Sequence, residues 1–402
     1  MSTGVATLTI NDRVSRVLNH YLLPIGWLVI MTGMFWAWER SLYHKFFYLF
    51  LAAPTLVALA MQPALLRRLL VNPLFAAFLA FSVYMMISVA WAEPESDFGS
   101  LIKRPLYIAM LLFAAGIIAL KTPERMAQLT RVAGMIAALA AAVSVVYFIV
   151  NAEPGNMGRL EGYGALYNPL LSGHVYGAFA AFWMGTWFLS RSPFSPLPLL
   201  CLAALGLLLI ATGSRTPLVG LAAAFAWLLI VCDKKRGLLA LGVIVAMLAG
   251  LVALHPEIVT QRGVSYRPEI WAESLRQISL KPWLGYGYDT PMVVMLASLP
   301  DYPLFDPHNI ELGVLYAGGI VGLTLWLVLY GLAMTFCWKN RRDPAVVLAA
   351  AWLIFGFASG LTEGNAFMSR PKEHWFLIWL PMAMVYAQWL IHWQGWALKK
   401  SQ

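Results

Sequence analysis

Long apolar stretches alternate with short polar segments along most of the chain. Five stretches contain no charged residue: 46–66, 69–92, 132–152, 192–214 and 312–338. Each approaches or exceeds the roughly 20 residues that a membrane-spanning helix needs. Outer-membrane strands would instead alternate over segments of about 10 residues. The pattern therefore predicts an all-α integral membrane protein.

The apolar stretches predict about twelve spans within one polytopic membrane domain over residues 1–402. Their ranges are 21–38, 46–63, 73–92, 105–120, 132–150, 169–190, 196–212, 216–232, 237–254, 309–336, 344–362 and 375–393. No internal repeat is visible, which disfavours a secondary transporter. One long polar interruption, residues 255–308, separates spans nine and ten and forms a large loop.

Lysine and arginine predict the orientation of these spans. With a cytoplasmic amino terminus, the inner loops carry 16 basic and four acidic residues, and the outer side keeps 12 basic and 15 acidic residues. The inside is then +12 and the outside −3, as the positive-inside rule requires. We expect a bacterial inner-membrane protein with both termini in the cytoplasm and the 255–308 loop in the periplasm.

The composition supports a membrane protein and argues against a soluble or nucleic-acid-binding protein. The chain is 60% hydrophobic and only 12% charged, whereas soluble domains carry about 25% charged residues. The net charge of +9 follows from the loop asymmetry, so no nucleic-acid partner is expected. Cys201, Cys232 and Cys337 lie in or beside apolar stretches. No second thiol or histidine stands at ligand spacing, so we predict neither disulfides nor a metal site.

The polar loop contains a predicted short amphipathic helix. After Pro268, apolar residues recur with helical spacing at Ile270, Trp271, Leu275 and Ile278. Such a helix suits the membrane surface. Arg267 just precedes it, where backbone amides favour an anion, so Arg267 is a candidate phosphate ligand. The alternative is ordinary pairing with Glu269 or with lipid headgroups.

Arg215 is a second candidate anion ligand. It stands between two apolar runs with almost no loop, and Pro217 begins the following helix. An arginine at the exterior membrane face is costly without an anionic partner. We interpret it as an anion clamp beneath the large loop. A snorkelling arginine at a helix end is the alternative.

His308 is the candidate general base. Asp306 suits an N-cap and Pro307 the first helical position, which places His308 in the first turn of span ten. The positive helix end disfavours imidazolium, so we expect a neutral ring that accepts a proton. Glu311 lies three residues on and is expected to orient the ring. A structural, hydrogen-bonded histidine is the alternative.

Further charged residues and a predicted turn lie on the same exterior side of the membrane as His308. Lys103 and Arg104 are expected to open span four, and Arg370 stands in the last exterior loop. Either site can bind phosphate, with lipid headgroups as the default partner. Glu363 is a candidate acid partner for an arginine. The glycines in Pro282-Trp283-Leu284-Gly285-Tyr286-Gly287 predict a tight turn with close backbone approach.

Nucleotide and metal motifs are missing from the sequence. There is no P-loop, kinase signature or usable nucleophile elbow, and we expect no divalent metal site on the exterior loops. Chemistry on a phosphorylated lipid would therefore rely on arginine and lysine to neutralise the leaving group.

Four motifs occur in order and on one predicted face. They are Ser214-Arg215, Arg267-Pro268-Glu269-Ile270-Trp271, the Pro282–Gly287 segment, and His308-Asn309 followed by Leu312 and Gly318-Gly319. In this order they resemble the bacterial O-antigen ligase family over about residues 205–365. The superfamily is shared with O-antigen polymerases and protein O-oligosaccharyltransferases.

The resemblance implies a GT-C-like membrane fold and a metal-independent, inverting glycosyltransferase without a cofactor. Such an enzyme would move a glycan from undecaprenyl diphosphate to a sugar of lipid A–core, among membrane lipids. Carried over, His308 would activate the acceptor hydroxyl, and Arg215 and Arg267 would stabilise the diphosphate. Lys103, Arg104 and Arg370 have less specific contexts, and we assign them to the donor site by charge and face.

Two alternatives remain at this stage. A polymerase or a protein transferase would use the same donor, although the absence of an added soluble domain favours a ligase. A lipid-linked glycan flippase or other transporter would carry basic residues along a cavity at the membrane midplane. In this sequence they gather on one face.

Overall fold

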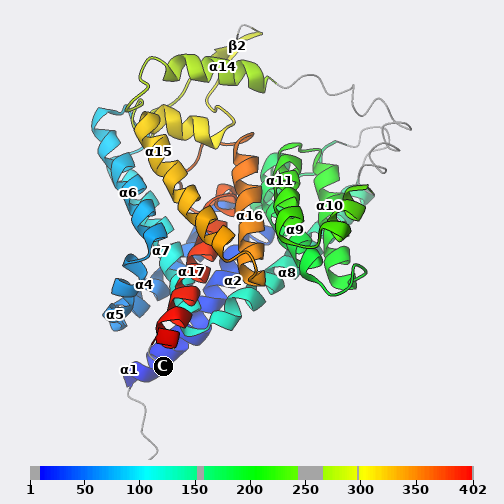
Figure 1. Ribbon diagram of the computed structural model, residues 1–402. Coiled ribbons are helices and arrows are strands. Elements are labelled where there is room, and N and C mark those ends of the chain that lie inside the picture. The colour runs from blue at the N-terminus through cyan, green and yellow to red at the C-terminus, as the bar shows by residue number, and fades with distance from the viewer. Residues whose placement is uncertain (1–9, 152–157, 243–265, 297, 401–402) are drawn as a thin grey trace, which may run out of the picture.

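The structure is a computed structural model that describes residues 10–151, 158–242, 266–296 and 298–400. Helices dominate it (Figure 1). The helices are α1 (Ile10–Val17), α2 (Leu23–Thr32), α3 (Arg40–Phe46), α4 (Ala53–Met61), α5 (Pro63–Leu70), α6 (Pro73–Ser88), α7 (Phe98–Lys121), α8 (Pro123–Val150), α9 (Pro169–Leu189), α10 (Pro196–Thr212), α11 (Thr216–Val231), α14 (Arg267–Ile278), α15 (Ile310–Lys339), α16 (Pro344–Gly360) and α17 (Trp379–Lys400). Two strands, β1 (Val294–Leu296) and β2 (Leu299–Leu304), pair antiparallel.

Seven helical segments of the described residues are long and apolar enough to cross a membrane. They are Ile10–Phe35, Arg40–Met61, Pro73–Trp91, Phe98–Lys121, Pro123–Val150, Ile310–Lys339 and Glu373–Gly395. Helices α10, α11 and α16 are apolar but shorter. The chain is thus an all-α, multi-pass membrane protein, as the sequence predicts. The ninth expected span, 237–254, lies mostly outside the described residues, and the total of twelve stays a prediction.

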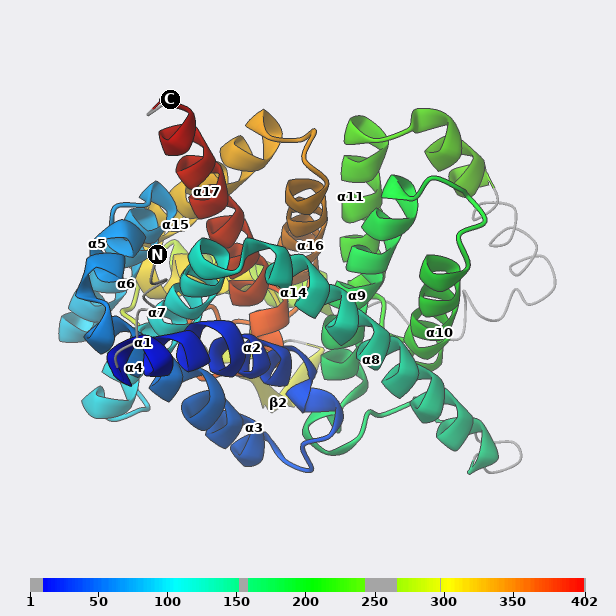
Figure 2. The same ribbon diagram turned by 90° about the horizontal axis from the view of Figure 1, so that it is seen from below.

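The helices form a bundle with a shared centre. Helix α17 packs along α7, with α6 and α15 together on one side and α9, α10 and α11 on the other (Figure 2). Helix α16 packs against α9, α11 and α17 and so joins the two sides. Fully buried aromatic residues such as Trp326, Trp352 and Trp379 fill the centre. Helices that are apolar all round require this burial in protein or lipid.

Helix starts follow local sequence signals. The side chains of Asn72, Asn168 and Asp343 each accept the backbone N–H two residues later at 2.8 Å. A proline follows each of them at the first helical position. Capping satisfies an amide that the helix itself leaves unpaired, and proline there loses no hydrogen bond. These short signals explain why many predicted boundaries agree with the structure.

The described part of the large polar loop, residues 266–296 and 298–308, forms a small layer over one end of α15 (Figure 1). Ile270 and Ile278 of α14 pack with Val294, Leu296 and Tyr316 in a second apolar cluster. The predicted amphipathic helix is confirmed, and these residues of its apolar face contact protein. The β1–β2 hairpin was not predicted. Residues 255–265 of the loop lie outside the described residues.

The tight turn predicted around the glycines is confirmed and contacts a break in α15. Gly319 interrupts that helix with φ +60 and ψ −163. The amide of Tyr286 donates to the Tyr316 carbonyl at 2.8 Å, and the amide of Ile320 donates to the Pro282 carbonyl at 2.8 Å. Gly285 has φ +69, and a Cβ there would lie 2.5 Å from the Tyr316 oxygen. Only glycine fits such a close approach at positive φ.

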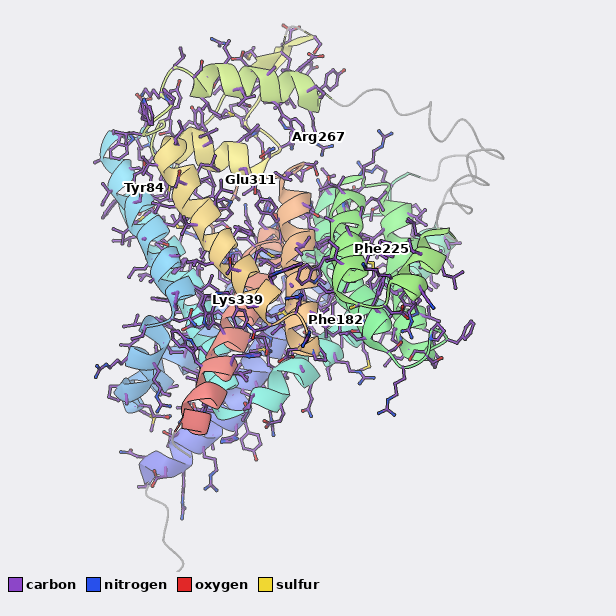
Figure 3. All side chains as sticks on the ribbon, in the orientation of Figure 1. Tyr84, Phe182, Phe225, Arg267, Glu311 and Lys339 are labelled. Atoms are coloured by element: carbon purple, nitrogen blue, oxygen red, sulfur yellow. The ribbon has the colours of Figure 1, made fainter. Side chains whose placement is uncertain are left out.

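Charged residues of the loop face and one of the predicted inner face lie at opposite ends of α15. Figure 3 shows Arg267 and Glu311 near one end of α15 and Lys339 at the other. This separation agrees with the expected placement of these residues on two faces of a membrane. The periplasmic and cytoplasmic assignments of those faces stay predictions.

Candidate functional site

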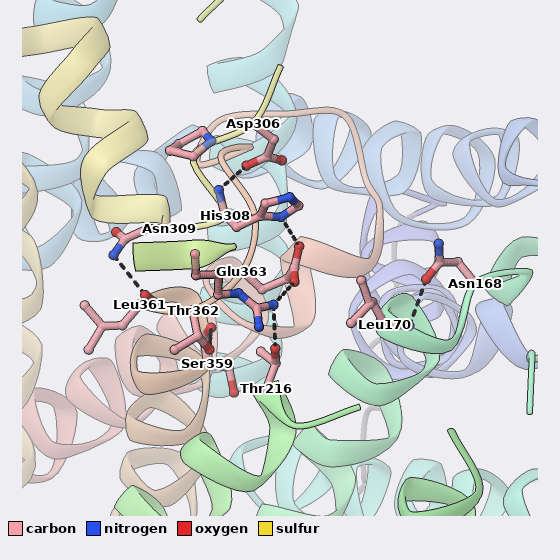
Figure 4. Close-up of polar contacts among 12 residues, drawn as sticks. Asn168, Leu170, Thr216, Asp306, His308, Asn309, Ser359, Leu361, Thr362 and Glu363 are labelled. Atoms are coloured by element: carbon pink, nitrogen blue, oxygen red, sulfur yellow. Dashed lines mark hydrogen bonds and ion pairs between the residues drawn. The ribbon is translucent and has the colours of Figure 1, made fainter. Parts of the chain in front are cut away.

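His308 lies in the short connection between β2 and α15. Its backbone has φ +49, and its N–H donates to Asp306 Oδ1 at 2.7 Å (Figure 4). Helix α15 begins at Ile310, and Asn309 is its N-cap: Asn309 Oδ1 accepts the N–H of Leu312 at 2.9 Å. The expectation that Asp306 caps the helix and that His308 sits in its first turn is therefore wrong.

The physical reason for the difference is local. Asp306 accepts the amide of His308 two residues on, which closes an Asx-turn around Pro307. Asparagine has the same capping chemistry as aspartate, so the cap shifts by three residues. Asn309 also donates from Nδ2 to the Leu361 carbonyl at 2.8 Å. That bond fastens the connection before α15 to the end of α16.

Glu363 links His308 to Arg267. Its Oε1 lies 2.8 Å from His308 Nδ1, and its Oε2 accepts from Arg267 Nη2 at 2.7 Å (Figure 4). Arg267 Nη2 also lies 3.4 Å from Thr216 Oγ1. Glu363 is only 7% exposed. The prediction that Glu363 pairs with an arginine is confirmed.

The carboxylate beside the ring of His308 is Glu363 rather than Glu311. Because His308 precedes the helix, the spacing that would put Glu311 on the same helical face does not apply. Among the described residues, Glu311 makes no hydrogen bond or ion pair with His308. The contact with the ring that was expected from Glu311 is made by Glu363, which lies 55 positions after His308.

The pKa values of this pair move in opposite directions. The hydrogen bond to Glu363 raises the pKa of His308, although burial opposes the rise. Burial would raise the pKa of Glu363, but the hydrogen bond from His308 and the charges of His174, His308 and Arg267 outweigh it and lower the pKa to about 2. The expectation that the helix dipole depresses the basicity of His308 is wrong, because the adjacent carboxylate dominates.

This geometry suits a general base. An ionised Glu363 accepts the Nδ1–H of His308, which leaves the Nε2 lone pair for a proton from substrate. A carboxylate that holds the ring in one tautomer and stabilises the imidazolium is the arrangement used in hydrolase triads. The His308 side chain is 31% exposed, so a hydroxyl can reach it. Arg267 adds a fixed positive charge next to the base.

Arg215 lies at the same end of the bundle, beside the residue that Arg267 contacts. Gly213, with φ +58, ends α10, and Arg215 occupies the N-cap position of α11, directly before Thr216, without a side-chain capping bond. The Arg215 side chain is exposed and forms no ion pair within the described part of the chain. Arg215 thus stands next in sequence to Thr216, which Arg267 Nη2 approaches.

Arg104 contacts a different group of residues from His308 and Arg267. Its guanidinium donates to Asp289 Oδ1 at 2.6 Å, to the Tyr288 hydroxyl at 3.0 Å and to Ser96 Oγ at 2.6 Å. Helix α7 begins at Phe98, so Lys103 and Arg104 lie inside it rather than at its start as expected. The reason is the N-cap Asp97, which accepts the Ser100 amide at 2.9 Å. Lys103 is exposed.

A polar cavity of about 680 Å³ lies next to the base. Arg104 and Arg370 line it, together with Pro307, the residue before His308. His308, Lys103, Arg215 and Arg267 are not among its lining residues. The predicted site residues therefore fall into two groups: His308 and Arg267 with Arg215 nearby, and Arg104 with Arg370 on the cavity wall.

Sequence reasoning missed two charged groups at this cavity. Arg40 lines it and pairs at 3.1 Å with Glu373, which is 2% exposed. These two residues are 333 positions apart, and no local pattern connects them. Within the described ranges, no group of three or more histidine, cysteine, aspartate or glutamate residues could hold a metal ion.

Fold and site together define a polytopic helical membrane protein with a histidine–carboxylate–arginine group at one end of its bundle. A family model described as O-antigen ligase matches residues 199–327. A curated O-antigen ligase of Pseudomonas aeruginosa is 59% identical over 377 residues, which cover 94% of this chain and 92% of that protein. The chain therefore belongs to the O-antigen ligase family and is an enzyme, and the predicted resemblance is confirmed.

Proposed function

We propose that this enzyme moves an O-antigen glycan from undecaprenyl diphosphate to a sugar hydroxyl of lipid A–core, with inversion at the anomeric carbon and without a metal ion. Family membership supports O-antigen ligation in lipopolysaccharide assembly. The observation that carries the mechanism is the chain of contacts from His308 through Glu363 to Arg267. It joins a base to a cation at one end of the bundle.

His308 activates the acceptor in this proposal. Its Nε2 takes the proton of the acceptor hydroxyl while that oxygen forms a bond to the anomeric carbon. The bond from the anomeric carbon to the diphosphate oxygen breaks, and its electron pair stays on the diphosphate. Glu363 stabilises the resulting imidazolium, as a buried carboxylate does for a histidine base.

Arg267 and Arg215 stabilise the leaving group. A diphosphate gains negative charge as it departs, and fixed cations aimed at developing charge lower the barrier. When His308 becomes positive, Glu363 faces two cations, and Arg267 is held less tightly by it. Proton transfer thereby favours contact of Arg267 with the diphosphate. The sugar is already activated by its phosphate link, so no nucleotide is needed.

The alternatives differ in what becomes of the glycan. A polymerase would join one glycan to another, a protein transferase would attach it to a serine, and a flippase would move it without forming a bond. The basic residues Arg215 and Arg267 lie at one end of the bundle, which favours an enzyme over a transporter. Placement of this end in the periplasm, with both termini in the cytoplasm, is part of the proposal.

Purified protein tests these alternatives. It is mixed with undecaprenyl-diphosphate-linked glycan and, in separate mixtures, with lipid A–core, with no added acceptor or with a candidate protein acceptor, always without nucleotide and with a chelator. Glycan attached to lipid A–core is the expected product. Glycan–glycan or glycan–protein product would replace the ligase assignment, and the absence of any product in all mixtures would favour transport.

A further inference from the structure

The polar cavity beside His308 is built from segments far apart in the sequence. Its wall includes Arg40 and His44 of α3, Arg104 of α7, residues 288–292, and residues 365–370 with Lys372. Residues 95–97 with Ser100, Phe305 and Pro307, and residues 313, 316 and 317 of α15 also line it. At about 680 Å³, its volume is in the range of small-molecule sites, roughly 300–1,000 Å³.

Two of the cations on the wall are neutralised within the protein. Arg104 is paired with Asp289, and Arg40 is paired with Glu373. The carboxylate of Asp97, another wall residue, is hydrogen bonded to Ser100 at the start of α7. These contacts fix the shape of the cavity, and the charged wall residues that they leave are Glu95, Arg370 and Lys372.

Arg370 and Lys372 are the cations that remain. For neither of them does the described structure contain a carboxylate within ion-pair distance. Burial, with the charges of Arg40 and Arg104, lowers the pKa of Lys372, although Glu373 opposes this. A partly buried ammonium with no carboxylate within ion-pair distance gains from an anion that enters the cavity.

The position of the cavity relative to the base points to its ligand. Pro307 belongs to its wall, and the Trp271 indole N–H holds the Pro307 carbonyl at 3.1 Å. Asp306 lies between Phe305 and Pro307, which both line the cavity. Figure 4 shows Asp306 and Thr216 on opposite sides of His308. The arginines Arg215 and Arg267 belong to the Thr216 side. Inversion requires the nucleophile and the leaving group on opposite faces of the sugar.

We propose that this cavity holds the acceptor, and that Arg370 and Lys372 bind an anionic group, phosphate or carboxylate, on the acceptor oligosaccharide. This inference rests on the proposed function of the site. It changes the provisional assignment of Arg370 from the donor to the acceptor.

Kinetics with two acceptor preparations test the proposal. Arg370→Ala and Lys372→Met are compared with wild type and with Lys45→Ala, an exposed lysine of α3 that does not line the cavity. The acceptor is purified lipid A–core, used as isolated, after enzymatic dephosphorylation and after carboxyl reduction. We expect each cavity variant to raise the KM for the native acceptor by about 10-fold or more, as loss of a charge-assisted contact does.

The pattern across acceptors separates the outcomes. The KM for donor and the kcat should stay near wild type, and the difference between variant and wild type should vanish for the acceptor that lacks the recognised anion. Loss of the difference after dephosphorylation identifies phosphate, and loss after carboxyl reduction identifies an acidic sugar. A rise in donor KM, or an equal loss with all three acceptors, would overturn the proposal.

Binding to an inactive variant keeps the test independent of catalysis. Lipid A–core binding to His308→Ala protein is measured in detergent, with and without Arg370→Ala in the same chain. Weaker binding of the native acceptor in the double variant supports the cavity even if transfer is never observed. Unchanged binding would contradict it. Arg370 is exposed, so its replacement leaves the packed interior unchanged.

Discussion

Replacing Glu363 by glutamine tests the link between the base and the arginine. Glu363 touches His308 with one oxygen at 2.8 Å and Arg267 with the other at 2.7 Å. Arginine can only donate, so the amide oxygen of glutamine must face Arg267. Its NH₂ group then faces His308 Nδ1 and donates to it. The imidazole proton moves to Nε2, and the atom that should accept the substrate proton is blocked.

The magnitude follows from the role of the base. A positioned general base contributes about 10²–10⁴ in rate, and holding a histidine in the wrong tautomer costs about 10⁴ in a serine protease. We therefore expect Glu363→Gln to lower kcat by about 10²–10⁴, which is about 3–5 kcal/mol of transition-state stabilisation. The side chain keeps its shape, so membrane insertion should not change.

The pH dependence gives a second readout. The rate falls as His308 becomes protonated, so the acidic limb of kcat follows the pKa of His308, which Glu363 raises above 6.5. Glu363→Gln removes that carboxylate, and the midpoint of the limb should move to lower pH. Glu269→Gln, an exposed glutamate on α14, is the matched control and should change neither value.

Initial rates of glycan transfer between pH 5 and 9, with saturating donor and acceptor, measure both effects. A Glu363→Gln enzyme that keeps more than about a tenth of the wild-type kcat would refute the proposed dyad. So would an acidic limb that does not move. Thermal unfolding in detergent shows whether any loss of rate comes from a damaged fold.

Three further substitutions have defined outcomes. Arg267→Lys keeps the charge but loses the planar donor that reaches Glu363, so kcat/KM for donor should fall at least about 10-fold; an unchanged value would exclude a specific donor contact. Gly285→Ala places a Cβ 2.5 Å from a backbone oxygen at φ +69 and should lower unfolding stability by about 1–3 kcal/mol. Gly206→Ala, with no atom within 4 Å of its Cβ, is its control, and equal stability of both variants would contradict the argument. Asn309→Ala removes the cap of α15 and should cost about 1–2 kcal/mol and also lower kcat; a stable variant with full activity would show that the cap does not position the base.

The membrane helices could be predicted from the sequence because lipid offers the backbone no hydrogen-bond donors or acceptors. Every buried amide and carbonyl must pair within the segment, so a charge-free run of sufficient length becomes a helix. Helix α14 was equally predictable from the sequence, because its apolar residues recur at helical spacing. The strand β2 was not, since Pro300 and Pro303 interrupt it and proline within a run argues against a strand.

The site could be predicted only in part, because its side-chain contacts join residues far apart in the sequence. The sequence identified His308, Arg267 and Glu363 separately, but the residue that pairs with both others is 55 and 96 positions away from them. Locally, Asp306 and Asn309 are both good N-caps, and the non-local bond from Asn309 to the Leu361 carbonyl favours Asn309. The partner of Arg104 lies 185 positions away. Tertiary packing, rather than local sequence, determines these partners and the N-cap of α15.

The central claim is that His308 is the base for glycan transfer. His308→Ala is compared with His392→Ala, because both histidines contact a carboxylate and have similar side-chain exposure, 31% and 32%, at different places in the fold. Both proteins are purified, reconstituted and given undecaprenyl-diphosphate-linked glycan with lipid A–core. We predict that only His308→Ala loses transfer, while its insertion and donor binding stay intact. Full transfer by His308→Ala would contradict the account.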